Sequence, residues 1–138
     1  MLTLVQANTI LTAALAAVPE GCKPVAIVVL DASGHLKAAQ RQDGASMFRI
    51  EVATGKAWAA VSMGASSRKL AQRAKDNPIF FTTLAATSQG RFLPQAGAVL
   101  IASRDGEVLG AVGASGGTGD EDEALCIAAV LAAGLKPE

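Results

Sequence analysis

Three side chains that could carry chemistry lie within one short stretch, LDASGHLKAAQRQDGAS at residues 30–46. His35 is the only histidine of the chain, and Arg41 and Asp43 follow it. An imidazole can ligate a metal or move a proton, and a guanidinium can bind a carboxylate through two parallel hydrogen bonds. A solvent-facing histidine beside a turn, followed by a surface ion pair of little energetic consequence, is the simpler interpretation. These residues alone leave both interpretations open.

A second stretch, GASGG at residues 113–117, has the spacing of the nucleophile elbow of α/β-hydrolases, with Ser115 as the nucleophile. That fold needs a parallel sheet and a histidine after the serine, whereas His35 precedes Ser115. We therefore do not expect Ser115 to be a nucleophile. The glycines are better explained as backbone that turns tightly and approaches a neighbouring segment or a ligand.

Metal and nucleotide sites find little support in the side chains. The acidic run at 120–123 would oppose a phosphate, so we expect no nucleotide at the glycine loop. Cys22 and Cys126 lack paired spacing, which indicates reduced packing cysteines and not a zinc site. His35 could still serve as one axial ligand of a haem, which needs a single imidazole. Lys56 is expected on the solvated side of a helix of small residues.

The elements that position these residues are indicated by turns, caps and apolar periodicity. Two hairpins are predicted, at residues 25–41 around Ser33-Gly34 and at 98–113 around Asp105-Gly106, the second with a type I′ turn. Helices are predicted after a capping box at Thr3 and Gln6, from about Ser46, from Ser66 or Ser67, at Asn77-Pro78, and after a capping box at Thr118 and Glu121. Together these elements predict an α+β domain whose antiparallel sheet is built from two hairpins and flanked by helices, in a layered, profilin-like arrangement.

Length and composition bound the remaining possibilities. A chain of 138 residues is expected to form one domain, 1–138. Twelve basic and twelve acidic residues, without a basic block, argue against a nucleic-acid partner. The apolar run 124–135 is shorter than a membrane span needs, so we expect no membrane segment and a cytoplasmic location. The abundance of alanine, including Ala53, Ala57 and Ala60, predicts small-residue surfaces and a homo-oligomer.

Four strings carry a resemblance to a known family: VVLDASGHLKAAQRQDGAS, ATGKAWAA, GRFLP and RDGEVLGAVGASGGTGDEDEALCIAA. They resemble the GlcG/HbpS family over nearly the whole chain. That family includes haem-binding HbpS-type proteins, the C-terminal domain of PduO-type corrinoid adenosyltransferases and the GlcG proteins of glycolate-utilisation operons. The resemblance implies a compact α+β fold and assembly into homo-oligomers.

The resemblance also implies a glycine-lined ligand pocket near the ends of the hairpins. The residues it assigns to binding are Arg41, Asp43, Gly44, Lys56, Ser115, Gly116 and Gly117. Two departures from the family pattern fall near this pocket, Gln42 in place of a methionine and QAGAVLI in place of a stretch with a further glycine and a proline. The family's ligand therefore need not be the ligand of this chain.

Two functions follow from these residues and from the resemblance. The first is binding of haem or a related tetrapyrrole, with a corrinoid as the second choice and His35 as a candidate axial ligand. The alternative is an enzyme or enzyme accessory that acts on a small hydroxy- or oxo-acid. There, Arg41 and Lys56 would hold the carboxylate, and Asp43 or His35 would move a proton.

Overall fold

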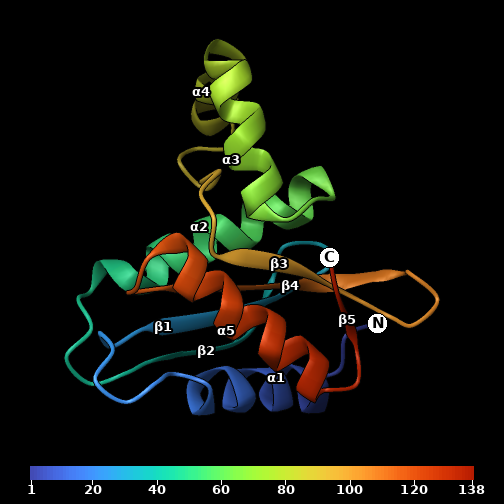
Figure 1. The fold of residues 1–138 in the computed structure, drawn as a ribbon. Coiled ribbons are helices and arrows are strands. Elements are labelled where there is room, and N and C mark those ends of the chain that lie inside the picture. Colours follow the sequence, from blue (N-terminus) through green and yellow to red (C-terminus); the bar gives the residue numbers. More distant parts are fainter.

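The computed structural model describes residues 1–138 and consists of three layers, with a sheet between two layers of helices (Figure 1). In chain order the elements are α1 (Leu4–Ala16), β1 (Ala26–Asp31), β2 (Leu36–Arg41), α2 (Phe48–Met63), α3 (Ser67–Asp76), α4 (Pro78–Thr87), β3 (Ala98–Ala102), β4 (Val108–Ser115), α5 (Gly119–Ala132) and β5 (Lys136–Pro137). The predicted α+β class and the two hairpins are confirmed.

The sheet has five strands in the order β2-β1-β4-β3-β5, and every neighbouring pair is antiparallel. The hairpins β1–β2 and β3–β4 lie side by side and are joined through β1 and β4. These two strands occupy the middle of the sheet because their residues are apolar on both faces, and nearly all of them are buried. The short edge strand β5 was not predicted from the sequence.

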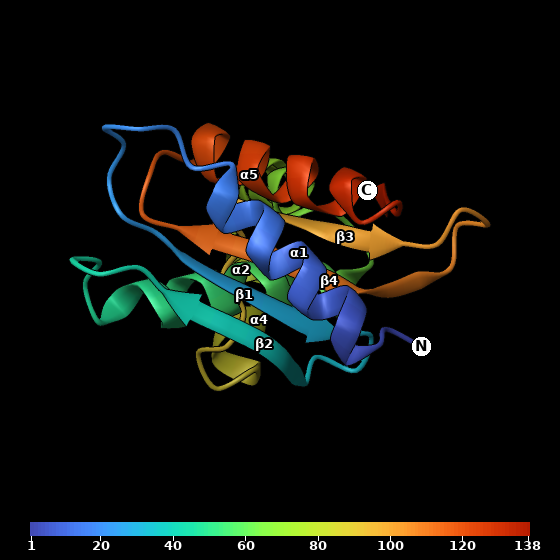
Figure 2. The same cartoon turned by 90° about the horizontal axis from the view of Figure 1, so that it is seen from below.

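Helices cover both faces of the sheet. Alternate residues of the strands, such as Val28 and Leu30, pack against α2, and the residues between them, such as Ile27 and Val29, pack against α1 and α5. Figure 2 shows α1 and α5 side by side across one face, with α2 behind the sheet. Not one of the helices combines the length and the apolar character that a bilayer span requires.

The small-residue face of α2 lies against the sheet and is not free for a partner. Ala53, Ala57 and Ala60 are fully buried beneath the strands. The sequence argument that these alanines contribute to an oligomer surface was therefore wrong. Their small side chains instead allow α2 to approach the sheet so closely that a Cβ atom on Gly113 would lie 2.4 Å from the Ala53 carbonyl oxygen.

Caps and turns agree with the sequence in most places. Both predicted capping boxes are present, at Thr3 and Thr118, and Ser66 caps α3. Ser46 is not the N-cap of α2, because Met47 occupies that position. The predicted type I′ turn is also wrong. A type I′ turn needs a positive φ at both central residues, but only Gly106 has one, of 88°. Residues 104–106 therefore form a three-residue hairpin loop that ends in a glycine in the left-handed region.

Helices α3 and α4 stand away from the sheet as an arm (Figure 1). Phe81 and Leu70 hold the arm together, packed in a small cluster with Phe92 and Ala59. Ile79 and Phe80 remain exposed on α4. The arm is therefore stabilised by its own small core, separate from the two clusters that sandwich the sheet.

Candidate functional site

The two hairpins bring their last residues together at one end of the sheet. Ala26 of β1 pairs with Arg41 on one side and with Ser115 on the other, so these residues form one row across β2, β1 and β4. His35 lies at the opposite end, where its carbonyl oxygen accepts from the Asp31 N–H at 2.8 Å. The length of β1, roughly 16 Å at about 3.3 Å per residue, separates the two ends. The lone histidine and the arginine therefore do not share a site within one chain.

A pocket of about 620 Å³ lies beside the glycine loop that joins β4 to α5. Its walls come from the α1–β1 connection, the glycine loop and the first turns of α5. The lining residues are Ala17, Val18, Pro19, Gly21, Cys22, Lys23, Val25, Gly116, Gly117, Thr118, Glu121, Asp122, Ala124, Leu125 and Ala128. Most of them are apolar or glycine, and Lys23 is the one cationic side chain among them. We refer to this as the glycine-loop pocket.

A second hollow, of about 640 Å³ and more open to solvent, lies next to it. Arg41, Gln42 and Asp43 line it from the end of β2, opposite residues of the α1–β1 connection. Val18, Pro19 and Cys22 border both hollows. Two sets of predicted binding residues thus lie in adjoining cavities, with the α1–β1 connection between them. We refer to this one as the arginine hollow.

The side chains of the arginine hollow do not form the surface ion pair that was one of the two interpretations of the sequence. Arg41 is exposed, and its guanidinium donates to the carbonyl oxygen of Ala45. No ion pair joins Arg41 to Asp43, which is also exposed. Gly44 has a φ of +84°, which turns the chain toward α2. The remaining donors of Arg41 and the whole carboxylate of Asp43 are thus available to a ligand.

The glycine loop is held in place by contacts that only glycine allows. Gly116 has a φ of +150°, and a Cβ atom there would lie 2.3 Å from the Pro24 carbonyl oxygen. The loop therefore passes directly against the segment that leads into β1. The next residue, Gly117, donates its N–H to Asp122 Oδ1 at 3.0 Å.

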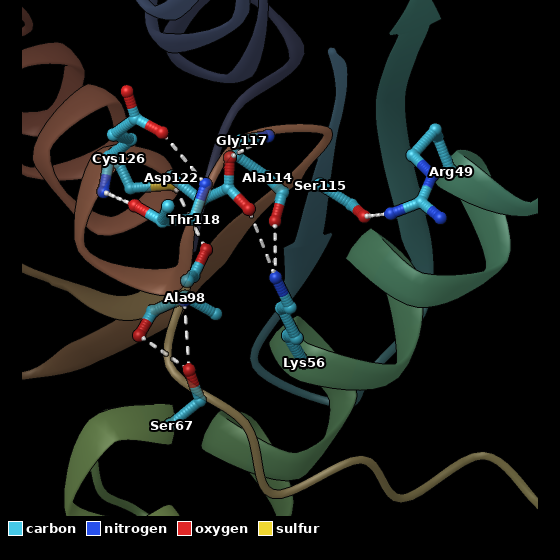
Figure 3. Close-up of polar contacts among 12 residues, drawn as sticks. Arg49, Lys56, Ser67, Ala98, Ala114, Ser115, Gly117, Thr118, Asp122 and Cys126 are labelled. Atoms are coloured by element: carbon cyan, nitrogen blue, oxygen red, sulfur yellow. Dashed lines mark hydrogen bonds and ion pairs between the residues drawn. The ribbon is translucent and has the colours of Figure 1, made fainter. Parts of the chain in front are cut away.

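Lys56 is buried, contrary to the expectation that it is solvated. Only 6 % of its surface is exposed, and its Nζ donates to the Ala114 carbonyl oxygen at 3.0 Å and to Asp122 Oδ2 at 3.2 Å (Figure 3). The prediction failed because the sequence shows no partner for Lys56 near it in the chain. Its partner Asp122, 1 % exposed, belongs to the acidic run 120–123, for which the sequence indicates only an unfavourable effect on a phosphate.

The hydroxyl of Ser115 is also engaged. It is buried, and it accepts from Arg49 Nη1 at 3.0 Å, an interaction visible in Figure 3. Ser115 lines neither the glycine-loop pocket nor the arginine hollow. Arg49 was missed by the sequence analysis, as were Cys22 and Lys23 in the pocket wall. The only signal for Arg49 was its position in the first turn of a helix that begins after a small-residue loop.

Both cysteines are unpaired. Cys22 is exposed where the two hollows meet, whereas Cys126 is fully buried behind the pocket with its Sγ 3.5 Å from the Gly97 carbonyl oxygen. Burial, with a smaller contribution from nearby Asp122, raises the pKa of the Cys126 thiol far above its ordinary range. No three His, Cys, Asp or Glu side chains lie close enough together to hold a metal ion.

These features define a class: a small layered α+β protein with an apolar pocket where a glycine loop meets the end of its sheet. Comparison with known proteins then gives the family. A family model described as "Haem degrading protein HbpS-like" matches residues 2–131, and the chain belongs to this family. The expected family membership is thereby confirmed.

Individual relatives agree with this assignment. The corrinoid adenosyltransferase PduO of Citrobacter freundii is 28 % identical over 113 residues, which cover 82 % of this chain and 33 % of the relative. The chain thus spans about a third of that enzyme. A crystal structure of a PduOC–haem complex superposes with a TM-score of 0.86 at 25 % identity, over 97 % of this chain and 96 % of the other. The crystal structure of HbpS gives a TM-score of 0.81 at 28 % identity, over 94 % and 88 % of the two chains.

Proposed function

We propose that this protein binds a tetrapyrrole, with haem as the first candidate and a corrinoid as the second. The observation that carries the proposal is the glycine-loop pocket. Its volume lies within the range of small-molecule and cofactor sites, and its walls are mainly apolar. A flat, apolar macrocycle fits such walls. The similarity in fold to a PduOC–haem complex supports the same ligand class.

The residues that would hold the macrocycle come from three segments. The α1–β1 connection and α5 supply apolar contacts, and Gly116 and Gly117 present bare backbone on which a ring system can lie. Propionate groups need cations, and two are at hand: Lys23 in the wall and Arg41 in the adjoining hollow. When bound, a haem would supply redox and oxygen chemistry, whereas the chain supplies shape, apolar cover and charge.

His35 remains a proposed axial ligand under one condition. Because it lies at the far end of β1, an axial bond to iron in the glycine-loop pocket requires the histidine of a second copy. We also propose that the protein is a homo-oligomer of single-domain chains, 1–138, with the pocket near a subunit contact. Exposed apolar side chains on the helical surfaces, such as Leu4, Val5 and Leu131, support self-association. The unpaired cysteines support a cytoplasmic location.

Titration with haemin, followed by absorbance, tests the proposal. We expect a sharp Soret band that saturates at one haem per chain or per dimer. Arg41→Ala should weaken the affinity about tenfold through loss of a charged contact, with unfolding unchanged. Arg104→Ala, at the tip of the other hairpin, is the matched control. A featureless titration of the wild-type protein would contradict the proposal.

The arginine hollow favours the alternative function. Arg41 and Asp43 face an open, more polar space that suits a small hydroxy- or oxo-acid better than a macrocycle. In that case Arg41 holds the carboxylate, and Asp43 accepts from a hydroxyl. Lys56 cannot share this task, because its Nζ is buried against Asp122. Binding of glycolate or glyoxylate by the wild-type protein but not by Arg41→Ala, without any haemin binding, would establish this alternative.

A further inference from the structure

The buried ion pair of Lys56 and Asp122 connects two helices that lie on opposite faces of the sheet. Lys56 comes from α2 and Asp122 from α5, and the lysine side chain passes the end of the sheet to reach its partner (Figure 3). Lys56 does not line the glycine-loop pocket, whereas Asp122 does. The lysine therefore has no direct path to a ligand, and its contribution to the pocket must pass through the carboxylate.

Gly97 provides the space for this crossing. A Cβ atom at Gly97 would lie 2.6 Å from Lys56 Nζ and 3.1 Å from the Ala114 carbonyl oxygen. The ammonium group thus occupies the volume that any other residue at position 97 would fill. Because the backbone at Gly97 and Ala114 leaves so little room around the lysine side chain, the position of Nζ is fixed. The carboxylate that Nζ contacts is then fixed as well.

Asp122 divides its two oxygens between the lysine and the pocket wall. Oδ2 accepts from Lys56 Nζ at 3.2 Å, and Oδ1 accepts from the Gly117 N–H at 3.0 Å. A buried carboxylate without a cation becomes protonated or turns toward water. Because Asp122 lines the pocket, the water nearest to it is that of the pocket itself. Loss of the lysine would then free the Gly117 amide and place a polar group among the apolar walls.

We infer that Lys56 is a positioning residue for the ligand pocket: through Asp122 it fixes the Gly117 backbone that forms one wall. The identity of the ligand in this inference rests on the proposed function, but the fixing of Gly117 does not. The role differs from the direct contact with a ligand carboxylate that the family resemblance suggested for Lys56.

Two double variants that differ at one position test this inference. Lys56→Gln with Asp122→Asn removes both charges but keeps an oxygen facing Gly117. Lys56→Gln with Asp122→Leu removes both charges and that oxygen, and keeps the number of side-chain heavy atoms at position 122. Hydrogen exchange of the Gly117 amide is measured by NMR in the ligand-free proteins, and the dissociation constant for haemin by absorbance.

In the Asn variant we expect Gly117 exchange and haemin affinity close to those of the wild-type protein. The Leu variant should unfold cooperatively, exchange Gly117 at least about tenfold faster, and bind haemin about tenfold more weakly. If the Leu variant does not fold, the double variant Lys56→Gln with Asp122→Ala takes its place, because alanine is smaller than leucine.

The single variant Lys56→Gln leaves the Asp122 carboxylate buried without its cation and should also exchange Gly117 faster than the wild-type protein. Equal Gly117 exchange in the two double variants, or exchange in Lys56→Gln as slow as in the wild-type protein, would overturn the inference. If the wild-type protein binds no haemin, the proposed function fails. The Gly117 exchange rates then still decide whether Lys56 acts through Asp122 on the loop.

Discussion

The two hairpins are alike at their turns and differ at their other ends. Asp31 and Ser103 occupy equivalent positions: each donates its N–H at 2.8 Å to the carbonyl oxygen of the residue four positions later, and each accepts the N–H of a left-handed glycine. Each also accepts a further N–H through its side chain, Asp31 from His35 and Ser103 from Glu107. Both hairpins show a register shift just before the turn. Setting Gly34 over Gly106 therefore superposes two equivalent turns.

Beyond the strands the equivalence ends. When the two hairpin sequences are aligned at Gly34 and Gly106, Ser46 corresponds to Thr118 and Arg49 corresponds to Glu121. Thr118 and Glu121 form a capping box and start α5, whereas Met47 starts α2, and Arg49 turns to Ser115. The two helices then cover opposite faces of the sheet.

The difference shows how similar hairpins can border two kinds of cavity. The loop after β4 is pressed against Pro24 and held by Asp122, and it borders the mainly apolar glycine-loop pocket. The loop after β2 has no buried ion pair, leaves Asp43 exposed, and borders the more polar arginine hollow. A fixed loop can form a shaped wall, and an exposed one can only contribute side chains.

The largest expected contrast between the loops is in stability. Asp122→Ala leaves the Lys56 ammonium buried without a counter-charge, which should lower the free energy of unfolding by about 3–5 kcal/mol. Asp43→Ala in the other loop removes an exposed carboxylate and should change it by less than about 0.5 kcal/mol. Urea unfolding of both variants measures the difference. Similar values would mean that the ion pair does not distinguish the loops.

The second-largest contrast is the loss of stability when a glycine of each loop is replaced by alanine. Gly116→Ala combines an unfavourable φ with a clash against the Pro24 carbonyl, and we expect a loss of about 2–4 kcal/mol. At Gly44 a Cβ atom would meet nothing closer than 3.6 Å, so Gly44→Ala should lose only about 1–2 kcal/mol from its positive φ. The same unfolding experiment ranks them. A greater loss at Gly44 would contradict the close approach at Gly116.

A smaller contrast concerns the helix caps. Thr118→Ala removes the side-chain acceptor for the Glu121 N–H and should destabilise the protein by about 1 kcal/mol. Ser46→Ala, at the equivalent position, should cost less than about 0.5 kcal/mol because Ser46 does not cap α2. Thermal unfolding monitored by circular dichroism suffices, and equal shifts would indicate that both residues cap.

The smallest contrast lies in the turns and depends on pH. The backbone N–H of His35, together with that of Ser33, holds the pKa of Asp31 below its ordinary value of about 3.9. A depressed folded-state pKa means that the contribution of Asp31 is complete above that ordinary value and is lost as the pH falls through the folded value. The amide signal of His35 should therefore shift in NMR spectra between pH 5 and pH 2, whereas Ser103, at the equivalent position of the other turn, has no carboxylate to protonate. Asp31→Asn should abolish the His35 shift.

The features that sequence analysis identified correctly are local ones. Hairpin turns, capping boxes and the N-cap at Ser66 depend on residues within a few positions of one another, and their side chains carry the signal. The type I′ turn was wrong because Asp105-Gly106 suits two turn types. The structure places only Gly106 in the left-handed region.

The missed features join distant parts of the chain. Lys56 and Asp122 are 66 positions apart, as are Arg49 and Ser115, and no periodicity indicates that they meet. Lys56 in a helix of small residues resembles any solvated lysine until the sheet end and Gly97 are in place. The loops that border the two hollows were thus predictable from the sequence, whereas the pairing of the charges behind them depended on the tertiary fold.

The crossing of Lys56 past the sheet end also bears on the order of folding. Its ion pair with Asp122 closes a long stretch of chain and requires both helices to have docked on their own faces of the sheet. We therefore expect it to form after the rate-limiting step. Lys56→Gln with Asp122→Asn should then change the unfolding rate and leave the refolding rate nearly unchanged, which makes the pair a determinant of how long the native state persists.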